Sequence, residues 1–312
     1  MFCILLVYPR FTYYHCKHWI YKYTNNSADN KSNDNHLVVI LISNDFNPEK
    51  YQAFTKILHL AFLKKRKYNK LIDLYLSVII DGSCNSDGNG TLTFKEFDQR
   101  KIMADTSIIK SIIKMFSLDI ILIYTALILK KRIAVYHHNL DTLLQFIRSL
   151  PGFVWHRNNW DQILYPVNDL SSNFELEELR SQNHYIAGFL DADIENKPDL
   201  YDICVNLAAV EITISHSSRE YFAMTKTHKD IAIFMSRQGE SSLSDYEVIQ
   251  EINGKTKELI KTLVSMGSDS TDEEVINENS KQKITLDNIK AKNLSFALET
   301  FLFNLAVAED LV

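Results

Sequence analysis

The sequence predicts an α/β fold, in which helices and strands alternate along the chain. Ile120 to Ile128 carries apolar residues at helical spacing, and Ile133 to Tyr136 is an apolar run of strand length. A second helical pattern covers residues 140–150, and Ile163 to Val167 is again strand-like. This alternation is typical of a right-handed crossover between parallel strands of one sheet.

The helical pattern of residues 140–150 also predicts part of the core. Leu143, Leu144 and Ile147 lie on its apolar face, so we expect them to pack on the sheet. Truncating a buried leucine to alanine typically costs about 2–5 kcal/mol. On the sequence alone, Leu144→Ala is therefore expected to lower the melting temperature clearly.

The next segments continue the alternation of helix and strand. Phe174 to Ser181 is expected to be a helix, and Tyr185 to Leu190 to be a third core strand. Tyr201 to Asn206 and Glu211 to Ser215 follow as two strands around a short turn. The segments from residue 120 to 215 thus predict one sheet with helices packed on it.

The two ends of the chain differ in pattern. Before residue 104, the patterns predict strands at Phe2–Tyr8, Phe11–Tyr23 and Leu37–Ile42, and we expect the last of these to be covered on both faces. Helices are expected to follow at residues 47–67 and Leu71–Ile80. After residue 215 we expect helices at Arg219–Arg237, at Asp245–Leu263 and from Ser295 onward. Residues 267–283 are polar and mostly acidic, which indicates a solvated linker.

Composition limits the classes of function. The net charge is −5, and nucleic-acid-binding surfaces are usually basic, so we expect no nucleic-acid partner. The four cysteines are far apart without a CxxC pair, which favours reduced thiols in the cytoplasm over a disulfide or a zinc site. The longest apolar stretch, Ile120 to Leu129, is too short to cross a bilayer, so we expect no transmembrane segment.

One segment resembles a calcium-binding EF-hand loop. Asn85, Asp87, Asn89 and Glu96 stand at the first, third, fifth and twelfth ligand positions of the motif. However, asparagine replaces the usual aspartate at the first position, and the chain shows no second loop of this kind. We therefore expect no metal and no other cofactor, and interpret the segment as an Asp/Asn/Gly surface loop between two helices.

Catalytic motifs are absent from the sequence. There is no GxSxG, Walker, GxGxxG or HExxH pattern. His137 and His138 follow a predicted strand, where open α/β sheets place their ligands. Asp191, Asp193 and Glu195 follow another strand, either as an acid/base pair or as polar loop residues. The sequence therefore favours a protein that binds other proteins.

Several segments carry a resemblance to a known family. LILKKRIAVYHHNLDTLLQFIRSLPGFVW, ILYPV, YIAGFL and PDLYDICVNL resemble the central module of the DENN domain family, in which a D-x-x-V-N/D-L hairpin follows an acidic loop. WHRNNWDQIL, GFLDADIENKPDLYD and the His228-Lys229 pair are similar to one short member of that family. The resemblance covers residues 37 to 311.

The resemblance implies a protein with two lobes. Residues 1–104 would form an N-terminal longin-like α/β lobe, which is incomplete because little before Leu37 matches the family. Residues 105–312 would form a DENN α/β lobe with a helical C-terminal part. DENN proteins bind Rab GTPases in the cleft between the lobes and promote release of GDP as guanine nucleotide exchange factors. Such exchange needs no covalent catalysis, only tighter binding of the open form of the GTPase.

The resemblance also implies a place in the cell and an alternative function. The short member is associated with late endosomes, so we expect a cytoplasmic protein peripheral to that membrane. The alternative is an adaptor without exchange activity that docks on coiled-coil subunits of the Commander endosomal sorting assembly. For the Rab partner, we expect contacts from His137, His138, Asn139, Asp191 and Asp193, because these residues follow strand ends.

Overall fold

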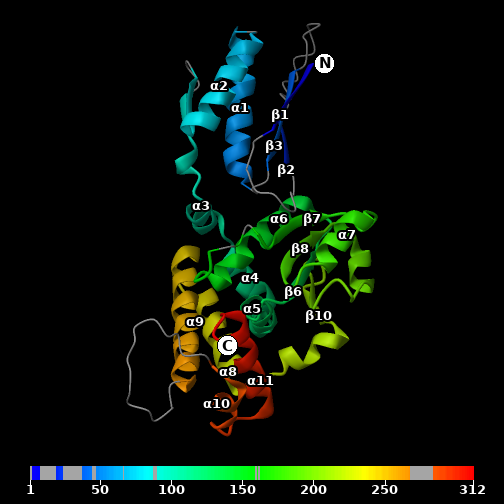
Figure 1. The fold of residues 1–312 in the computed structure, drawn as a ribbon, viewed down its shortest axis with the longest axis vertical. Coiled ribbons are helices and arrows are strands. Elements are labelled where there is room, and N and C mark those ends of the chain that lie inside the picture. Colours follow the sequence, from blue (N-terminus) through cyan, green and yellow to red (C-terminus); the bar gives the residue numbers. More distant parts are fainter. Residues whose placement is uncertain are drawn as a thin grey trace. The chain divides into compact units, whose positions relative to one another are not determined.

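The structure is a computed structural model that describes residues 2–7, 19–23, 37–43, 47–65, 67–86, 90–158, 160, 162–267 and 284–312. The chain divides into two compact units, here called the N-terminal unit (Met1–Ile102) and the C-terminal unit (Met103–Val312). Both units mix helices with sheets (Figure 1), so the predicted α/β class is confirmed.

The N-terminal unit is built on a sheet of strand order β1-β3-β2. β3 (Leu37–Ser43) lies between β1 (Phe2–Val7), which is parallel to it, and β2 (Trp19–Tyr23), which is antiparallel. Val39 and Leu41 are fully buried against side chains of α1 (Pro48–Lys65). Ile40, which alternates with them, is partly exposed, so the expectation that this strand is covered on both faces does not hold at Ile40.

Two helices complete this core. α2 (Tyr68–Asp81) packs on α1 through Leu71, Leu74 and Val78. It ends at Gly82, whose φ of 67° is left-handed and whose N–H donates to the Val78 carbonyl at 3.0 Å. Glycine adopts this conformation without the steric cost of a Cβ atom, which explains why the helix ends there.

The EF-hand-like segment forms a β-hairpin instead of the expected loop between two helices. β4 (Ser83–Ser86) and β5 (Gly90–Thr93) pair antiparallel, with Asn85 opposite Thr91. Cys84 and Leu92 are buried beneath the hairpin, whereas Asn85 and Glu96 are exposed. Glu96 belongs to a short 3₁₀ helix, η1 (Phe94–Glu96). Asp87 and Asn89 lie outside the described residues, and the absence of bound calcium stays a prediction.

The C-terminal unit is built on a sheet of strand order β10-β9-β6-β8-β7. Its strands are β6 (Arg132–Tyr136), β7 (Leu164–Asn168), β8 (Tyr185–Phe189), β9 (Ile203–Asn206) and β10 (Glu211–Ile214). β9, β6, β8 and β7 are mutually parallel, and β10 is antiparallel to β9. The three predicted core strands therefore share one sheet, with β8 between the consecutive strands β6 and β7.

Both faces of this sheet are covered. Ile133 and Val135 of β6 point into the main core, whereas Ala134 between them points to a smaller core on the other face. The smaller core is closed by α7 (Asn173–Arg180) and the 3₁₀ helix η4 (Ala192–Asn196). Burial on both faces explains why these strands are almost continuously apolar in sequence.

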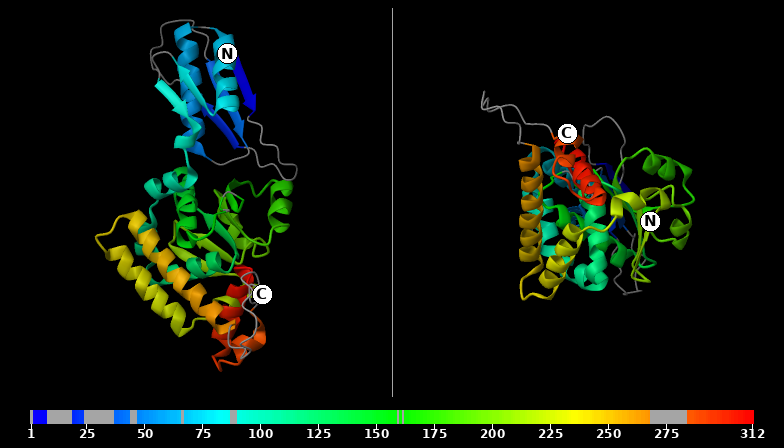
Figure 2. Two further views of the ribbon diagram at one scale, coloured as in Figure 1. Left: turned by 60° about the vertical axis from the view of Figure 1, so that its left-hand side comes forward. Right: turned by 90° about the horizontal axis from the view of Figure 1, so that it is seen from below.

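The main core is covered by most of the helices (Figures 1 and 2). They are α4 (Ile109–Phe116), α5 (Ile120–Ile128), α6 (Leu140–Ser149), η3 (Leu150–Val154), η5 (His216–Phe222), α8 (Lys226–Glu240), α9 (Asp245–Gly267), α10 (Leu286–Lys290) and α11 (Phe296–Ala308). The short 3₁₀ helix η2 (Ser117–Asp119) follows α4 and has no buried residue. α3 (Gln99–Thr106) precedes them. Sequence pattern predicted α5, α6, α8, α9 and α11 but not α3, α4 or α10, and most of the predicted linker lies outside the described residues.

One stretch meets the length and hydropathy expected of a membrane span. Within the described ranges, Ile109–Ile128 is the candidate, with a mean hydropathy of 1.9, and 61% of its window is buried inside the structure. The stretch is interrupted at Ser117, where φ is 52° and α4 gives way to η2. Its apolar side chains line the main core, which accounts for the high hydropathy without a membrane.

The structure corrects the predicted core face of α6. Leu143 and Ile147 are fully buried, but Leu144 is only partly buried and does not belong to the core. We therefore expect Leu143→Ala to destabilise the protein by about 2–5 kcal/mol and Leu144→Ala to cost clearly less. Chemical denaturation of both variants checks this, and equal losses would contradict the observed orientation of the helix.

Candidate functional site

The predicted partner-binding residues lie at one edge of the five-stranded sheet. His137, His138 and Asn139 follow β6, and Asp191 and Asp193 follow β8. β6 and β8 are adjacent and parallel, and the His137 N–H donates to the Phe189 carbonyl at 3.2 Å. We call this end of β6, β7, β8 and β9, with the loops that follow, the carboxyl edge.

The segment after β6 is held by local hydrogen bonds. The Asn139 side chain accepts a hydrogen bond from the Thr142 N–H at 2.9 Å and so caps α6. The Asn139 N–H donates to His137 Nδ1 at 3.0 Å, and the His137 and His138 rings stack with centroids 4.4 Å apart. His138 and Asn139 are exposed, so this short turn presents polar atoms on a fixed backbone.

The segment after β8 presents carboxylates. Asp191 accepts a hydrogen bond from the Asp193 N–H at 3.0 Å and caps η4. Glu195 accepts a hydrogen bond from the Asn206 side chain at 2.6 Å, which joins η4 to the end of β9. Asp191, Asp193 and Glu195 are all exposed. They give the carboxyl edge a negative charge, as expected for polar loop residues.

The described part of the chain offers little for covalent or metal chemistry. Within it, no group of three or more His, Cys, Asp or Glu residues could hold a metal ion. Cys84 and Cys204 are buried free thiols. Burial raises the pKa of Cys204 to about 12, so this thiol is not a nucleophile at neutral pH. The chemistry of the carboxyl edge therefore suits it to binding another surface.

The opposite end of the sheet holds an ion pair, Arg132–Asp202, that the sequence pattern did not predict. Asp202 accepts hydrogen bonds from the Arg132 backbone N–H at 2.7 Å, the Arg132 guanidinium at 3.2 Å and the Ser218 hydroxyl at 2.7 Å. Burial alone would raise the pKa of Asp202, but these hydrogen bonds outweigh it and hold the pKa below its usual value. Asp202 is the first residue of the D-x-x-V-N-L motif, which could have marked it. Its role is to join β9 to the start of β6.

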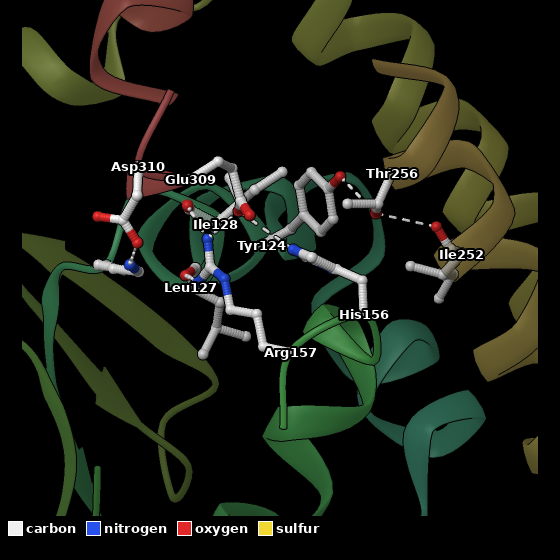
Figure 3. A network of polar contacts seen from close by, with 10 residues as sticks. Tyr124, Leu127, Ile128, His156, Arg157, Ile252, Thr256, Glu309 and Asp310 are labelled. Atoms are coloured by element: carbon white, nitrogen blue, oxygen red, sulfur yellow. Dashed lines mark hydrogen bonds and ion pairs between the residues drawn. The ribbon is translucent and has the colours of Figure 1, made fainter. Parts of the chain in front are cut away.

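A second buried network explains the His156-Arg157 pair between two tryptophans (Figure 3). Arg157 donates to the carbonyls of Leu127 and Ile128, at 2.7 and 2.6 Å, and so caps the end of α5. Arg157 and His156 also bind Glu309, which follows α11. Trp155 and Trp160 pack on each other in the main core, with ring centroids 4.8 Å apart. This segment therefore fastens the C-terminal helix to α5.

His228, from the His-Lys pair in the resemblance, is also structural. It is buried, and its N–H donates to the Thr225 hydroxyl at 3.3 Å while Thr225 N–H donates to its Nδ1 at 3.3 Å. These bonds form a capping box at the start of α8. Burial lowers the pKa of His228 to about 4, so the ring is neutral and packs against Phe301.

Comparison with known proteins shows what this architecture is similar to. The family model described as "Stabilization of polarity axis" matches residues 106–216, which include β6 to β10. DENN domain-containing protein 10 of Danio rerio is 40% identical over 278 residues, covering 89% of this chain and 76% of that protein. The Homo sapiens protein of the same name is 40% identical over 278 residues, covering 89% and 75%.

The similarity reaches distant organisms. DENN domain-containing protein 10 of Dictyostelium discoideum is 38% identical over 274 residues, covering 88% of this chain and 72% of that protein. These matches are longer than the C-terminal unit, so they include residues of both units. The resemblance to the DENN domain family is thereby confirmed. The chain belongs to the family of DENN domain-containing protein 10.

Proposed function

We propose that this chain is a Rab GTPase-binding protein that acts as a guanine nucleotide exchange factor at late endosomes, as a peripheral protein of the cytoplasm. The observation that carries the proposal is the 40% identity to DENN domain-containing proteins over 89% of the chain. In this proposal the N-terminal unit corresponds to an incomplete longin-like lobe and the C-terminal unit to the DENN lobe.

The chemistry of the carboxyl edge supports a role in binding. An exchange factor needs a surface with higher affinity for the nucleotide-free GTPase than for the nucleotide-bound one, because only differential affinity shifts that equilibrium. It needs no nucleophile, general base or metal of its own. The carboxyl edge offers exposed polar groups, His138, Asn139, Asp191 and Asp193, on backbone fixed by caps and by the sheet.

Charge reversal at the carboxyl edge tests the proposal. We expect Asp191→Lys with Asp193→Lys to weaken binding of a nucleotide-free Rab by about tenfold, because the proposed partner surface is basic there. The melting temperature should hardly change, since both side chains are exposed. Asp230→Lys with Glu251→Lys is the matched control, because it reverses two exposed charges on α8 and α9 instead.

The measurement is a pull-down and a nucleotide-release assay with a panel of late-endosomal Rabs, alongside a coiled-coil subunit of the Commander assembly. If Asp191→Lys with Asp193→Lys slows the release of labelled GDP and the control variant does not, the result supports exchange activity. Binding to the coiled coil, with no Rab bound preferentially in its nucleotide-free form, would favour the alternative of an adaptor without exchange activity. No binding of any Rab would refute the proposal.

A further inference from the structure

The carboxyl edge exposes large apolar side chains as well as carboxylates. Leu140 is 43% exposed, Leu190 is 41%, Val210 is 44% and Val167 is 38%. Leu140 begins α6 after β6, Leu190 follows β8, Val167 lies near the end of β7, and Val210 lies between β9 and β10. Each parallel strand therefore ends beside an exposed apolar residue.

The strand order places these residues in a row. In the strand order β9, β6, β8, β7, the corresponding exposed apolar residues are Val210, Leu140, Leu190 and Val167. Neighbouring strands lie about 4.8 Å apart, so the ends of these four strands span about 15 Å. Scattered exposed apolar residues are ordinary, but several that follow or end neighbouring strands at one edge of a sheet favour a site that binds another protein.

The turn between β9 and β10 gives independent support. Ala208, Ala209 and Val210 are all exposed, although such turns usually use Gly, Asn or Asp. Val210 has a φ of 57°, which is costly for a β-branched residue. The Asn206 side chain accepts a hydrogen bond from the Ala209 N–H at 3.0 Å and so fixes the turn. Turn formation alone would favour Asn or Gly at position 210, so valine there indicates a role for its side chain.

Carboxylates flank this row. Asp169 follows β7, and Asp191, Asp193 and Glu195 follow β8, all of them exposed. Hydrogen bonds from the backbone N–H and the hydroxyl of Ser171 lower the pKa of Asp169, so this group is ionised at neutral pH. A partner that covers the apolar row must therefore meet negative charge at its rim.

We propose that the row Val210, Leu140, Leu190 and Val167 is the centre of the GTPase-binding face, and that it takes a surface of the GTPase that is apolar at its centre and carries Lys or Arg around it. This inference rests on the proposed function. A second copy of this chain fits less well, because the carboxylates of two such edges would face each other. The negative charge also disfavours direct contact with nucleotide phosphates, so the face acts on the protein part of the GTPase.

The test separates binding from folding through position 210. Asparagine tolerates a positive φ, so Val210→Asn should leave the melting temperature unchanged or raise it while removing the apolar contact. We expect Val210→Asn combined with Leu190→Asn to reduce the affinity for the nucleotide-free GTPase by about tenfold or more. Ile233→Asn is the control, since Ile233 is 43% exposed on α8, outside the sheet.

The outcomes are distinct when the full chain is titrated against the Rab that it binds best, at low and high salt. Two results together support the proposed face: the double variant loses affinity while Ile233→Asn does not, and high salt weakens binding by the wild type. Unchanged affinity in the double variant overturns this inference while the proposed Rab binding stands. Absence of wild-type binding to every Rab overturns the proposed function and this inference together.

Discussion

Replacing Gly188 by alanine is expected to destabilise the C-terminal unit by about 3 kcal/mol or more, or to prevent its folding. Gly188 is a buried residue of β8, next to the irregular pairing with β7. A Cβ atom at Gly188 would lie 2.1 Å from the carbonyl oxygen of Pro166 and 2.5 Å from Cδ1 of Ile147. The first of these is a backbone atom in the neighbouring strand, so it cannot move without breaking the pairing. A glycine inside a strand commonly marks such a close approach.

Gly254 offers the matched control in the same unit. It lies in the middle of α9, and a Cβ atom there would meet nothing within 4 Å. Gly254→Ala should therefore stabilise the protein by about 0.5–1 kcal/mol, because alanine is the better helix former. Equilibrium denaturation of both variants, followed by circular dichroism, measures the contrast. A Gly188→Ala protein as stable as the wild type would contradict the packing of β7 against β8.

Replacing Arg157 by methionine is expected to cost about 3–5 kcal/mol, because a buried partner charge is left behind. Arg157 binds Glu309 and the carbonyls at the end of α5, and Glu309 is itself buried to a large extent. Methionine keeps the unbranched stem of the side chain but supplies neither charge nor the hydrogen bonds of the guanidinium. In a unit of this size, such a loss corresponds to a fall in melting temperature of about 6–20 °C. Trp155 and Trp160 pack nearby in the same core, so tryptophan fluorescence reports the transition.

The pH dependence of stability separates the ion pair from simple packing. Burial alone would raise the pKa of Glu309, but the hydrogen bonds and positive charges of His156 and Arg157 outweigh burial and lower the pKa to about 2. A carboxylate with a lowered folded-state pKa stabilises the fold above its unfolded pKa of 4.5, and this stability is lost as the pH falls toward 2. Glu309→Gln should therefore show a flatter loss of stability between pH 4.5 and pH 2 than the wild type. If the wild type and Glu309→Gln lose stability equally between pH 4.5 and pH 2, the ion pair makes no pH-dependent contribution to stability.

Local sequence pattern determined most of the secondary structure of the C-terminal unit. The strands β6, β8, β9 and β10 and the helices α5, α6 and α7 lie within a few residues of their predicted positions. These elements are short-range features, because apolar periodicity and capping residues such as Asn139 act within a few residues of each other. The order of helix and strand and the presence of a parallel sheet follow from the same patterns. The family was also evident from the sequence, through the segments that resemble DENN proteins.

The EF-hand-like segment and Leu144 show where local pattern was insufficient. A loop motif and a hairpin use the same Asp, Asn and Gly residues, so composition did not distinguish them. The pairing of Asn85 with Thr91 decided in favour of the hairpin. Leu144 lies beside the buried face of α6, and only the direction from which the sheet packs determined that Leu143 is buried more deeply.

Contacts between distant residues were decided by the tertiary structure alone. The order of the strands puts β8 between β6 and β7, and so brings Leu190 and Asp191 to the same edge of the sheet as His137. Arg157 and Glu309 are 152 residues apart, and Arg132 and Asp202 are 70 apart. Sequence periodicity carries no information about which distant charge completes a buried pair, because that choice depends on the packing of whole helices and strands. For the same reason, the sequence identified the residues at strand ends, but only the fold assembled them into one apolar and acidic edge.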